Sequence, residues 1–401
     1  MEDIRKQRFL TIETKTESNL EEMQQKIRQH RKKIAIRGAV AAAAVVIFIA
    51  AAGIYYQMKE YKNYEVTSEI ERSDSDGTQY VNFSGNILRY NNDGAFYADL
   101  SDQLIWNQAF EMQNPSVKLC ETYAVIADLQ GTQVYIMDTS GKQGELTLNR
   151  PIEAVCVAGQ GTIAVLTQAD GTSYLELYNK SGESLASGEI HVANSGYPLD
   201  IALSKDANKL AVSILDVGKG KAGTTVAFYN FGSVGQNEID NIVATYSYEN
   251  TVIPEIEFIS NDRMIAFGDN RILFFEGTQK PKEAESLKLK RQVKSVFFDS
   301  DYFGLVFAEE GSGNRHKMEV YDMKGKLRLE QEFDMPYQKI EFLENHEICV
   351  REEYKCEIYT MRGVKKFSYQ FNEGVQKIIS GKSGSRYTFI LDGVMQKVKL
   401  K

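Results

Sequence analysis

The chain contains two kinds of hydrophobic pattern, and the first gives way to the second at about residue 58. Residues 38–58 form a run of 21 residues without a charged side chain. As a helix rising about 1.5 Å per residue, this run is about 30 Å long, the thickness of the hydrocarbon core of a bilayer. After it, short alternating apolar runs are separated by Gly, Asn and Asp, which is typical of strands and turns. The pattern predicts one transmembrane helix followed by an all-β domain.

The charges that flank the apolar run predict its orientation. Six basic residues and no acidic residue lie between residues 26 and 37, whereas the flank after the run is balanced. Basic flanks remain in the cytoplasm. We therefore expect residues 1–37 in the cytoplasm, residues 38–58 in the cell membrane as a single span, and residues 59–401 outside the cytoplasm.

A cleaved signal peptide is the alternative interpretation of the run. Ala50–Ala52 offer the small residues of a cleavage site, and the many alanines make the run only moderately hydrophobic. The preceding segment, however, is long and contains acidic residues, unlike a short basic leader. Tyr55 and Tyr56 fit an aromatic belt at the outer interface of a membrane. The anchor is therefore preferred.

The residues before the run predict a helix. Leu20, Met23, Ile27 and Ile34 are spaced three, four and seven residues apart, which gives one apolar stripe on a helix that begins at about Ser18. The stripe could serve dimerisation or a cytosolic partner. A solvated, basic lead-in to the membrane explains it more simply.

The β region is built from a repeat. The unit at residues 152–190 breaks into four strands. The turn after its third strand recurs as MDTSG at 137–141, YNKSG at 178–182, YDMKG at 321–325 and YTMRG at 359–363. The residue just before this turn recurs about every 44 residues along the chain, and repeats of that length with four strands are typical of the blades of a β-propeller.

Counting strands predicts how the ring closes. Eight third strands can be counted, from Ala95–Leu100 to Met395–Leu400, but only seven fourth strands, from Gln103–Phe110 onward. Glu65–Ile70, within a linker at residues 59–77, could supply the missing strand and remove the exposed edges of an open array. We therefore predict eight four-stranded blades, with seven as the alternative.

Composition limits the class of partner. The whole chain carries a net charge of −8, and residues 1–58 carry +4, which leaves −12 for residues 59–401. An acidic domain argues against binding to nucleic acid and against docking on anionic lipid.

The four cysteines are too few for a disulfide scaffold in a domain of this length. A two-residue turn at Glu352–Glu353 would place Cys349 and Cys356 opposite each other, so that a cross-strand disulfide and two buried thiols both remain open. Cys120 and Cys156 occupy similar places in successive repeats and are expected in the core.

No catalytic, cofactor-binding or metal site is predicted. The histidines fall in different parts of the chain, without the spacing of a zinc site, and are expected to be isolated surface residues; they are His30, His191, His316 and His346. Neither a nucleophile elbow nor a phosphate-binding glycine loop occurs.

The stretch RSDSDGT at residues 72–78 is similar to part of a calcium loop. Aligned on Gly77, it places Arg72 where a carboxylate ligand is needed and Phe83 where the bidentate Glu should be. Asp74 and Asp76 could bind calcium in another geometry, but a polar turn is preferred.

Irregular stretches are the candidates for ligand binding, because loops on a rigid scaffold usually carry function. They are residues 106–116, 191–204 and 230–254, together with the turn at 267–271. Trp106 could be a ligand platform, although packing between blades is the preferred role. The candidate binding residues are Trp106, Asn114, Tyr197, Asp200, Asn237, Glu238, Asp240, Asp269 and Arg271.

Several phrases of the chain resemble an uncharacterised family of single-span membrane proteins from clostridia-type Gram-positive bacteria, classed only as a domain of unknown function. The phrases are SEIERSDSDGTQY, WNQAFEMQNP, SGYPLDIALS, FYNFGSVGQNEIDN and AFGDNR. The resemblance runs from about Tyr61 to the C-terminus, includes the anchor and implies no activity. More distantly, the repeats are similar to quinoprotein-like and WD40-like propellers, which implies a fold and nothing more.

These observations favour a non-catalytic ectodomain that binds a protein, a peptide or a cell-envelope component through one face of the ring. A quinoprotein-like dehydrogenase is the second hypothesis, but such enzymes use repeated tryptophan motifs and a carboxylate-held calcium, and this chain has one tryptophan. A transmembrane sensor that relays binding to the N-terminal segment is the third.

Overall fold

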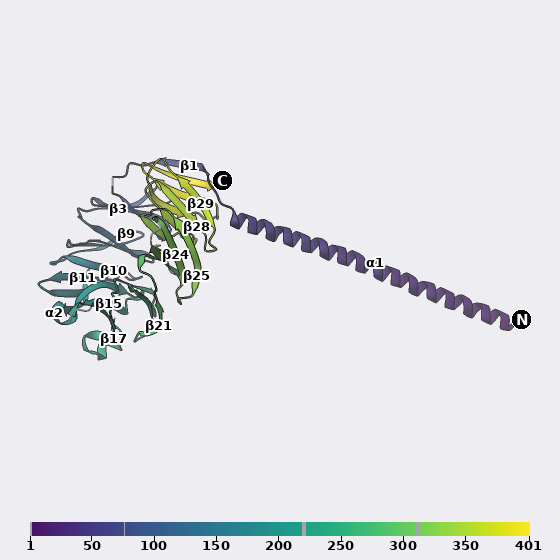
Figure 1. Cartoon of the computed structure of the whole chain (residues 1–401), viewed down its shortest axis with the longest axis horizontal. Coiled ribbons are helices and arrows are strands. Elements are labelled where there is room, and N and C mark those ends of the chain that lie inside the picture. The colour runs from purple at the N-terminus through teal and green to yellow at the C-terminus, as the bar shows by residue number, and fades with distance from the viewer. Residues whose placement is uncertain (1, 76, 219–221, 309–312) are drawn as a thin grey trace. The chain divides into compact units, whose positions relative to one another are not determined.

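The computed structural model describes residues 2–75, 77–218, 222–308 and 313–401, without the side chains of residues 2–22, 52, 54, 56 and 57. The chain divides into two compact units, Met1–Lys59 and Glu60–Lys401 (Figure 1). The first unit is one helix, and the second is all-β apart from short helical turns.

The helix of the first unit, α1, runs over Glu2–Met58. It begins long before Ser18, so the prediction of a helix start there is wrong. No glycine or proline occurs before Gly38 to interrupt the helix. Within it, Met23–Ala51 contains an apolar window long enough to be a membrane span or a signal sequence. The predicted contributions of the Leu20 and Tyr56 side chains lie outside the described residues.

The described part of the second unit contains eight four-stranded antiparallel sheets, the blades of a propeller (Figure 1). The strands of blades 1–4 are β2 Gln79–Phe83, β3 Asn86–Asn91, β4 Gly94–Ala98, β5 Leu104–Ala109; β6 Pro115–Cys120, β7 Tyr123–Asp128, β8 Gln133–Asp138, β9 Gly141–Thr147; β10 Ile152–Val157, β11 Ile163–Ala169, β12 Thr172–Tyr178, β13 Ser184–His191; β14 Tyr197–Leu203, β15 Lys209–Asp216, β16 Gly223–Asn230 and β17 Ile242–Glu249. Short helical turns flank or interrupt blade 4, namely α2 Val192–Ser195, η2 Gly235–Asn237 and η3 Ile239–Asn241.

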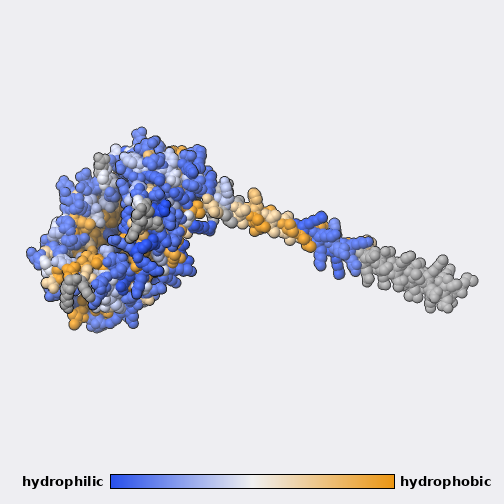
Figure 2. Space-filling model, viewed as in Figure 1, coloured by the Kyte–Doolittle hydropathy of each residue, from blue (hydrophilic) through white to orange (hydrophobic). Residues whose placement is uncertain are grey.

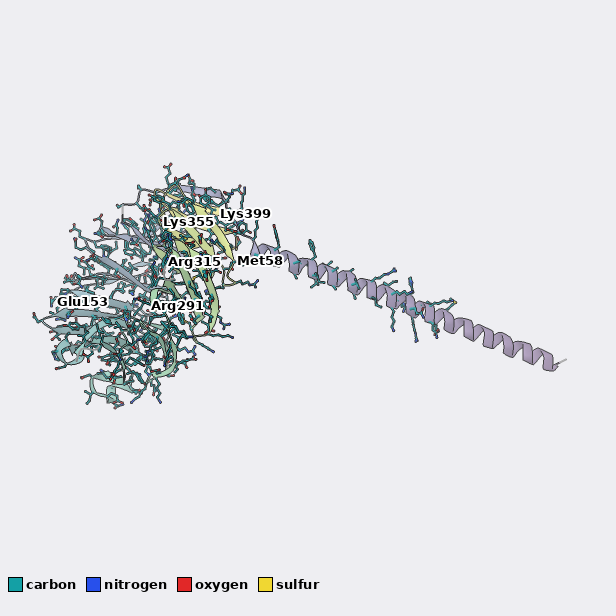
Figure 3. The ribbon with its side chains drawn as sticks, in the orientation of Figure 1. Met58, Glu153, Arg291, Arg315, Lys355 and Lys399 are labelled. Atoms are coloured by element: carbon teal, nitrogen blue, oxygen red, sulfur yellow. The ribbon has the colours of Figure 1, made fainter. Side chains whose placement is uncertain are left out.

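Blades 5–8 complete the ring. Their strands are β18 Glu255–Ser260, β19 Arg263–Phe267, β20 Arg271–Glu276, β21 Lys282–Lys288; β22 Val293–Phe298, β23 Tyr302–Ala308, β24 Arg315–Asp322, β25 Leu327–Asp334; β26 Lys339–Phe342, β27 Ile348–Arg351, β28 Lys355–Tyr359, β29 Lys365–Gln370; β30 Val375–Ser380, β31 Arg386–Leu391, β32 Val394–Leu400 and β1 Tyr64–Glu71. In Figure 3, Glu153 of blade 3 and Lys399 of blade 8 mark two distant parts of the ring.

The N-terminal strand β1 closes the ring by joining blade 8. It pairs antiparallel with β32, from Tyr64 opposite Leu400 to Glu71 opposite Val394, with a bulge between Val66 and Ser68. The prediction that residues 65–70 supply the missing fourth strand is confirmed. The seven-bladed alternative is wrong.

The recurring glycine turns have the predicted role, and polar side chains stabilise them. Asp138, Asn179 and Asp322 each accept hydrogen bonds from amides two to four residues later. In the fourth copy the Thr360 hydroxyl accepts the equivalent bonds. Gly182 adopts φ +86°, which explains why these turns end in glycine.

The alternation of strands gives the propeller two faces and a central channel. The first strands of neighbouring blades contact one another, so they are innermost and line the channel. Connections between strands 2 and 3 of a blade, and between successive blades, lie on one face, which we name the crossover face. Connections between strands 1 and 2 and between strands 3 and 4 lie on the opposite face. That terminal face also carries Asn63 and Lys401, joined by a backbone hydrogen bond.

Cys349 and Cys356 are buried free thiols. The turn of their hairpin is at residues 353 and 354, because Glu352 donates its amide to Lys355. A turn shifted by one residue shifts each cross-strand partner by two, so Cys349 lies opposite Ile358, and the predicted direct opposition is wrong. Burial raises the pKa of the Cys356 thiol well above its usual value.

Candidate functional site

The nine candidate binding residues do not form one site. They lie on the crossover face (Asn114, Tyr197, Asp269, Arg271), in the channel (Asp200), on the terminal face (Asn237, Glu238, Asp240) and in the core (Trp106). A site must therefore be built from a subset of them and from residues that the sequence did not single out.

Trp106 is a packing residue, as preferred from the sequence. It lies on β5, stacks near Tyr97 with ring centroids 5.4 Å apart, and is only 8% exposed. Its indole nitrogen donates to the carbonyl oxygen of Asp138 in blade 2 at 3.1 Å. This residue joins two blades and leaves no ring face for a ligand.

Asp269 and its neighbours are structural residues of the crossover face. The Asp269 side chain accepts the Val252 amide at 3.2 Å, and the Asn270 side chain donates to the Asn250 carbonyl at 2.6 Å. Arg271 donates to the Asn270 side chain at 3.0 Å. The turn thus fastens the connection between blades 4 and 5.

The same device recurs in other blades and was missed from the sequence. Asp128 in the equivalent turn of blade 2 accepts the amides of Gln113 and Asn114 at 3.0 and 2.8 Å. Asp392 in blade 8 accepts the Gly374 amide at 3.2 Å. An aspartate near the end of the second strand, as in blades 2, 5 and 8, was the available signal.

The candidate residues on the terminal face also stabilise the loop to which they belong. Glu238 accepts a hydrogen bond from Lys280 at 2.6 Å, and Asn237 donates to the Ser233 carbonyl at 2.8 Å. Asp240 lies in the left-handed region at φ +55°. Between them Ile239 is 85% exposed.

Three partly buried carboxylates lie together on the inner strands of blades 4 and 5. Asp200 is on β14, and Glu255 and Glu257 are two residues apart on β18, so their side chains share one side of that strand. Burial raises the pKa of Glu257 to about 7; the charge of Lys118 opposes this, and the charges of Asp200 and Glu255 add to it. Burial likewise raises the pKa of Asp200 and of Glu255.

This acidic wall is compensated only at a distance, by the charge of Lys118, which acts to lower the pKa of all three carboxylates. Asp200 accepts the Ile256 amide at 2.9 Å. Within the part of the chain that the structure describes, no salt bridge reaches any of the three carboxylates. A buried charge without a partner costs folding free energy, and such perturbed groups mark functional sites more often than ordinary surface acids do. A cationic group that entered the channel would recover part of this cost.

The wall formed by blades 7 and 8 is different. Glu341 on β26 pairs with Lys377 at 2.7 Å and also lies 3.9 Å from Lys339 and 3.8 Å from Arg351. Burial alone would raise the pKa of Glu341, but the charges of Lys377 and Lys339 lower it. Charges on this wall are matched, so the unmatched carboxylates of blades 4 and 5 stand out.

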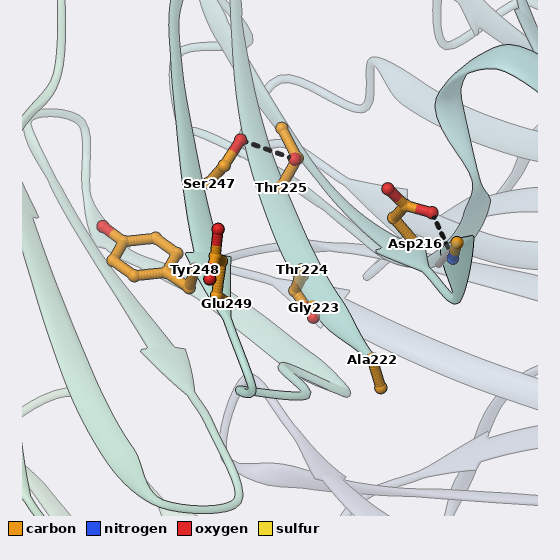
Figure 4. Close-up of a pocket in the computed structure, with 9 residues that line it drawn as sticks. Asp216, Ala222, Gly223, Thr224, Thr225, Ser247, Tyr248 and Glu249 are labelled. Atoms are coloured by element: carbon orange, nitrogen blue, oxygen red, sulfur yellow. Dashed lines mark hydrogen bonds between the residues drawn. The ribbon is translucent and has the colours of Figure 1, made fainter. Parts of the chain in front are cut away.

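Blade 4 also has a hollow on its outer strands at the crossover face (Figure 4). It measures about 310 Å³. Its lining residues are Asp216, Gly218, Ala222, Gly223, Thr224, Thr225, Ser247, Tyr248 and Glu249. Thr225 and Ser247 share a hydrogen bond of 2.9 Å across it.

Apolar side chains are exposed on the same face of blade 4. Tyr197 is 49% exposed and Val217 is 57% exposed. Figure 2 shows hydrophobic patches within the hydrophilic surface in the part of the ring where Figure 1 labels α2 and β17. The crossover face of blade 4 therefore combines exposed apolar groups, a hollow and the nearby acidic wall of the channel.

Asp74, in the polar turn at residues 72–78, takes part in a network of ion pairs and hydrogen bonds. Its carboxylate lies 2.7 Å from the Arg72 guanidinium, 3.1 Å from that of Arg89 and 2.7 Å from the Tyr80 hydroxyl. Two guanidinium groups already neutralise this carboxylate, which argues against a calcium ligand. The other aspartate considered there, Asp76, lies outside the described residues.

The expectation of isolated surface histidines is wrong for two of them. His316 is buried against Phe333 and Tyr337. The His346 ring lies 2.7 Å from the Asp299 carboxylate and 3.6 Å from that of Asp301. This arrangement could not be predicted from the sequence, because the three residues belong to turns of two different blades.

Asp299, Asp301 and His346 could together hold a metal ion. Their candidate ligand atoms all lie within 4.8 Å of one another on the terminal face. Direct hydrogen bonds within the group, and two backbone amides that donate to Asp299, already account for its geometry.

Comparison with solved structures gives matches of low sequence identity. BamB from Moraxella catarrhalis is 14% identical, with a TM-score of 0.49, over 84% of this chain and 100% of that one. The WD40 domain of Pan2 from Neurospora crassa is 8% identical, with a TM-score of 0.44, over 86% of this chain and 97% of that one. No curated protein sequence matches the chain.

Comparison with family models gives a match over nearly the whole second unit. The match extends over residues 57–400, from the end of α1 to the last residue of β32. It includes all eight blades and the strand that closes the ring. The protein therefore belongs to DUF5711, a family of unknown function.

Proposed function

We propose that the protein is a membrane-anchored, extracytoplasmic binding module without catalytic activity. Its N-terminus would be cytoplasmic, because the basic residues lie before the apolar segment of α1. Its partner, a protein or another component of the cell envelope, would dock on the crossover face of blade 4 and place a basic group in the channel.

The unmatched acidic wall is the observation that carries this proposal. Asp200, Glu255 and Glu257 are kept in a partly buried place where each has a raised pKa. A carboxylate wall selects a cationic group, and the exposed side chains of Tyr197 and Val217 supply apolar contact beside it. Binding through a rigid propeller face needs no chemistry from the protein.

Photo-crosslinking in intact cells tests the docking face. A photoreactive amino acid replaces Tyr197 or Val217 in the full chain, and Leu185, exposed on the outer strand β13, serves as the control position. We expect a discrete crosslinked product at the two blade 4 positions and none at Leu185. The substitution Glu257→Gln should remove that product without lowering the amount of protein. Equal products at all three positions, or no product at any, would overturn the proposal.

A thermal-shift measurement tests the absence of quinoprotein chemistry. The full chain is melted with calcium and a pyrroloquinoline cofactor, separately and together. A ligand at about a hundred times its dissociation constant adds about 2.7 kcal/mol of stability. We expect no change in melting temperature, and a clear rise with both ligands together would contradict a non-catalytic role.

A further inference from the structure

A second hollow, of about 480 Å³, opens at the terminal-face end of the seam between blades 8 and 1. Blade 8 supplies most of its wall, and Leu100 of blade 1 closes the far side. Thr388 lies directly opposite Lys397 in the pairing of β31 with β32, and Arg386 is two residues from Thr388. The three side chains therefore share the sheet face that looks toward blade 1.

The charge of this hollow is opposite to that of the domain. Three bases line it, Lys382, Arg386 and Lys397, and no carboxylate does. Among the residues that the structure describes, none of these bases takes part in a salt bridge. Lys397 donates to the Ser101 hydroxyl of blade 1 at 3.1 Å, so its ammonium group lies across the seam.

Nearby carboxylates are engaged elsewhere. Glu65 pairs with Lys401 at 2.9 Å, and Glu69 accepts a hydrogen bond from Gln396 at 2.8 Å. Glu344 accepts from the amide and the hydroxyl of Ser380 at 3.1 and 2.8 Å. Three uncompensated bases in a domain of net charge −12 form a local site for an anion.

The remaining lining indicates which kind of anion fits. The hydroxyl groups of Ser383 and Thr388 add hydrogen-bond donors beside the bases, whereas the Thr67 hydroxyl already donates to the Lys397 carbonyl at 2.9 Å. The side chains of Tyr387 and Val398 are buried on the opposite face of the sheet, toward blade 7, so the apolar side chain in the hollow is that of Leu100. A guanidinium and two ammonium groups match the several oxygens of a phosphate better than the two of a carboxylate. The volume is within the range of about 300–1,000 Å³ found for small organic ligands.

We propose that this hollow binds a phosphate ester carried on a small organic body, of which glycerol phosphate is the simplest example. Arg386 and Lys397 hold the phosphate oxygens, Lys382 closes the rim, and the organic body lies against Leu100. The site is on the face opposite the proposed docking surface and uses none of its residues. A free metabolite and the headgroup of an anionic phospholipid both present this chemistry.

Equilibrium binding to the full chain in neutral detergent tests the site. The probe is radiolabelled glycerol 3-phosphate, and glycerol is the uncharged control. We expect saturable binding by the natural chain and a dissociation constant at least about tenfold higher for Arg386→Gln and for Lys397→Gln. Lys282→Gln on the outer strand of blade 5 makes the same charge change at an exposed residue and should bind as the natural chain does.

Unchanged affinity in both Arg386→Gln and Lys397→Gln, or no binding by the natural chain, would overturn the proposal. Melting temperatures within about 2 °C of the natural value show that the variants are folded, and Arg386→Lys should restore part of the affinity. The photo-crosslink at Tyr197 should persist in Arg386→Gln, which separates this site from the proposed function.

Reconstitution into nanodiscs distinguishes the two sources of the ligand. If the headgroup occupies the hollow, discs of phosphatidylglycerol should abolish binding of the soluble probe, and discs of phosphatidylcholine should not. Equal binding in both discs assigns the site to a soluble phosphate ester. In either case, the Arg386→Gln variant should lose binding of the probe in every disc in which the natural chain binds it.

Discussion

Blade 8 meets its two neighbours through very different interfaces. Toward blade 7 it buries a large apolar cluster that includes Phe367, Phe371 and Phe389. Tyr64 of β1 packs into the same cluster, with its ring centroid 5.2 Å from that of Phe389. Burial of apolar surface, which contributes about 25 cal/mol per Å² and does not depend on charge, stabilises the centre of this aromatic seam. Two polar contacts lie beside that centre, the Glu341–Lys377 ion pair at 2.7 Å and the hydrogen bond from Tyr387 to Glu347.

Toward blade 1 the seam is smaller and polar. Its buried apolar residues are Tyr80, Ile87, Ile379, Ile390 and Met395. Beside them Arg72, whose side chain is 1% exposed, lies 2.7 Å from Asp74 and 3.4 Å from Asp102. One nitrogen of the Arg72 guanidinium is buried without a hydrogen-bond partner. Hollows open at both ends of this polar seam.

The difference shows that ring closure combines two kinds of interaction. The strand β1 contributes Tyr64 to the aromatic seam and is followed directly by Arg72 in the polar seam. The apolar centre of the aromatic seam should resist changes of pH and salt, whereas the ion network of the polar seam should respond to both. Four experiments test this contrast.

Deletion of residues 61–72 should have the largest effect, because it removes β1 and weakens both seams. We expect a loss of more than about 4 kcal/mol in the free energy of unfolding, well above that of an ordinary point substitution. Thermal and urea melts of the full chain measure it. An unchanged melting curve would refute closure of the ring by β1.

Substitutions at adjacent residues of β31 compare the two seams directly. Phe389 packs in the aromatic seam and Ile390 in the polar seam, and both are fully buried. Phe389→Ala should cost about 4 kcal/mol and Ile390→Ala about 2 kcal/mol, because the larger side chain leaves the larger cavity. Urea melts give both values, and a greater cost for Ile390→Ala would reverse the assignment of the main seam.

Arg72→Met should cost about 2 kcal/mol, since it leaves Asp74 without its nearest cation in a partly buried place. Arg315→Met is the matched control, because Arg315 is exposed at the start of β24 and its loss should change stability by less than about 0.5 kcal/mol. Urea melts at pH 7 compare the two. Equal effects would show that the polar seam contributes nothing specific.

Acid should also weaken the polar seam, and this effect on stability should be smaller than those of the substitutions above. Burial alone would raise the pKa of Asp74, but hydrogen bonds from Arg72 and Tyr80 and the guanidinium charges lower it below the usual 3.8. Its contribution is therefore present at neutral pH and is lost as the pH falls below that value. Asp74→Asn should cost on the order of 1 kcal/mol at pH 7 and less at pH 3. The cost of Phe389→Ala should not change over the same range, and a constant cost of Asp74→Asn would contradict the assignment.

The sequence predicted the architecture because the repeated turn is a local signal. Four copies end a third strand with a side-chain acceptor and a glycine, and the residue before the turn recurs about every 44 residues, so the blades could be counted from the chain alone. The missing fourth strand followed from that count. Exact register did not follow, since a turn displaced by one residue moved the partner of Cys349 from Cys356 to Ile358.

Candidate sites were harder to predict because the ring assembles them from distant repeats. Asp200 was selected as part of an irregular loop, but it lies on a strand, and its companions Glu255 and Glu257 look like the polar positions of an ordinary alternating strand. Likewise, Arg386 and Lys397 become neighbours only through the pairing of β31 with β32. An irregular loop in the sequence indicates that its residues are exposed. The members of these two groups lie on regular strands instead, and they meet because those strands are innermost in the ring or border the same seam.

The place of β1 in blade 8 has a consequence for biosynthesis. Tyr64 pairs with Leu400, so β1, the first strand to be synthesised, has no partner until β32, the last strand, is complete. Until then β1 and the first strands of the ring have unpaired edges, and contacts of such long sequence separation form slowly. The ring can therefore close only after the whole chain has been synthesised. A chain truncated before β32 would retain a strand that no other part of it completes.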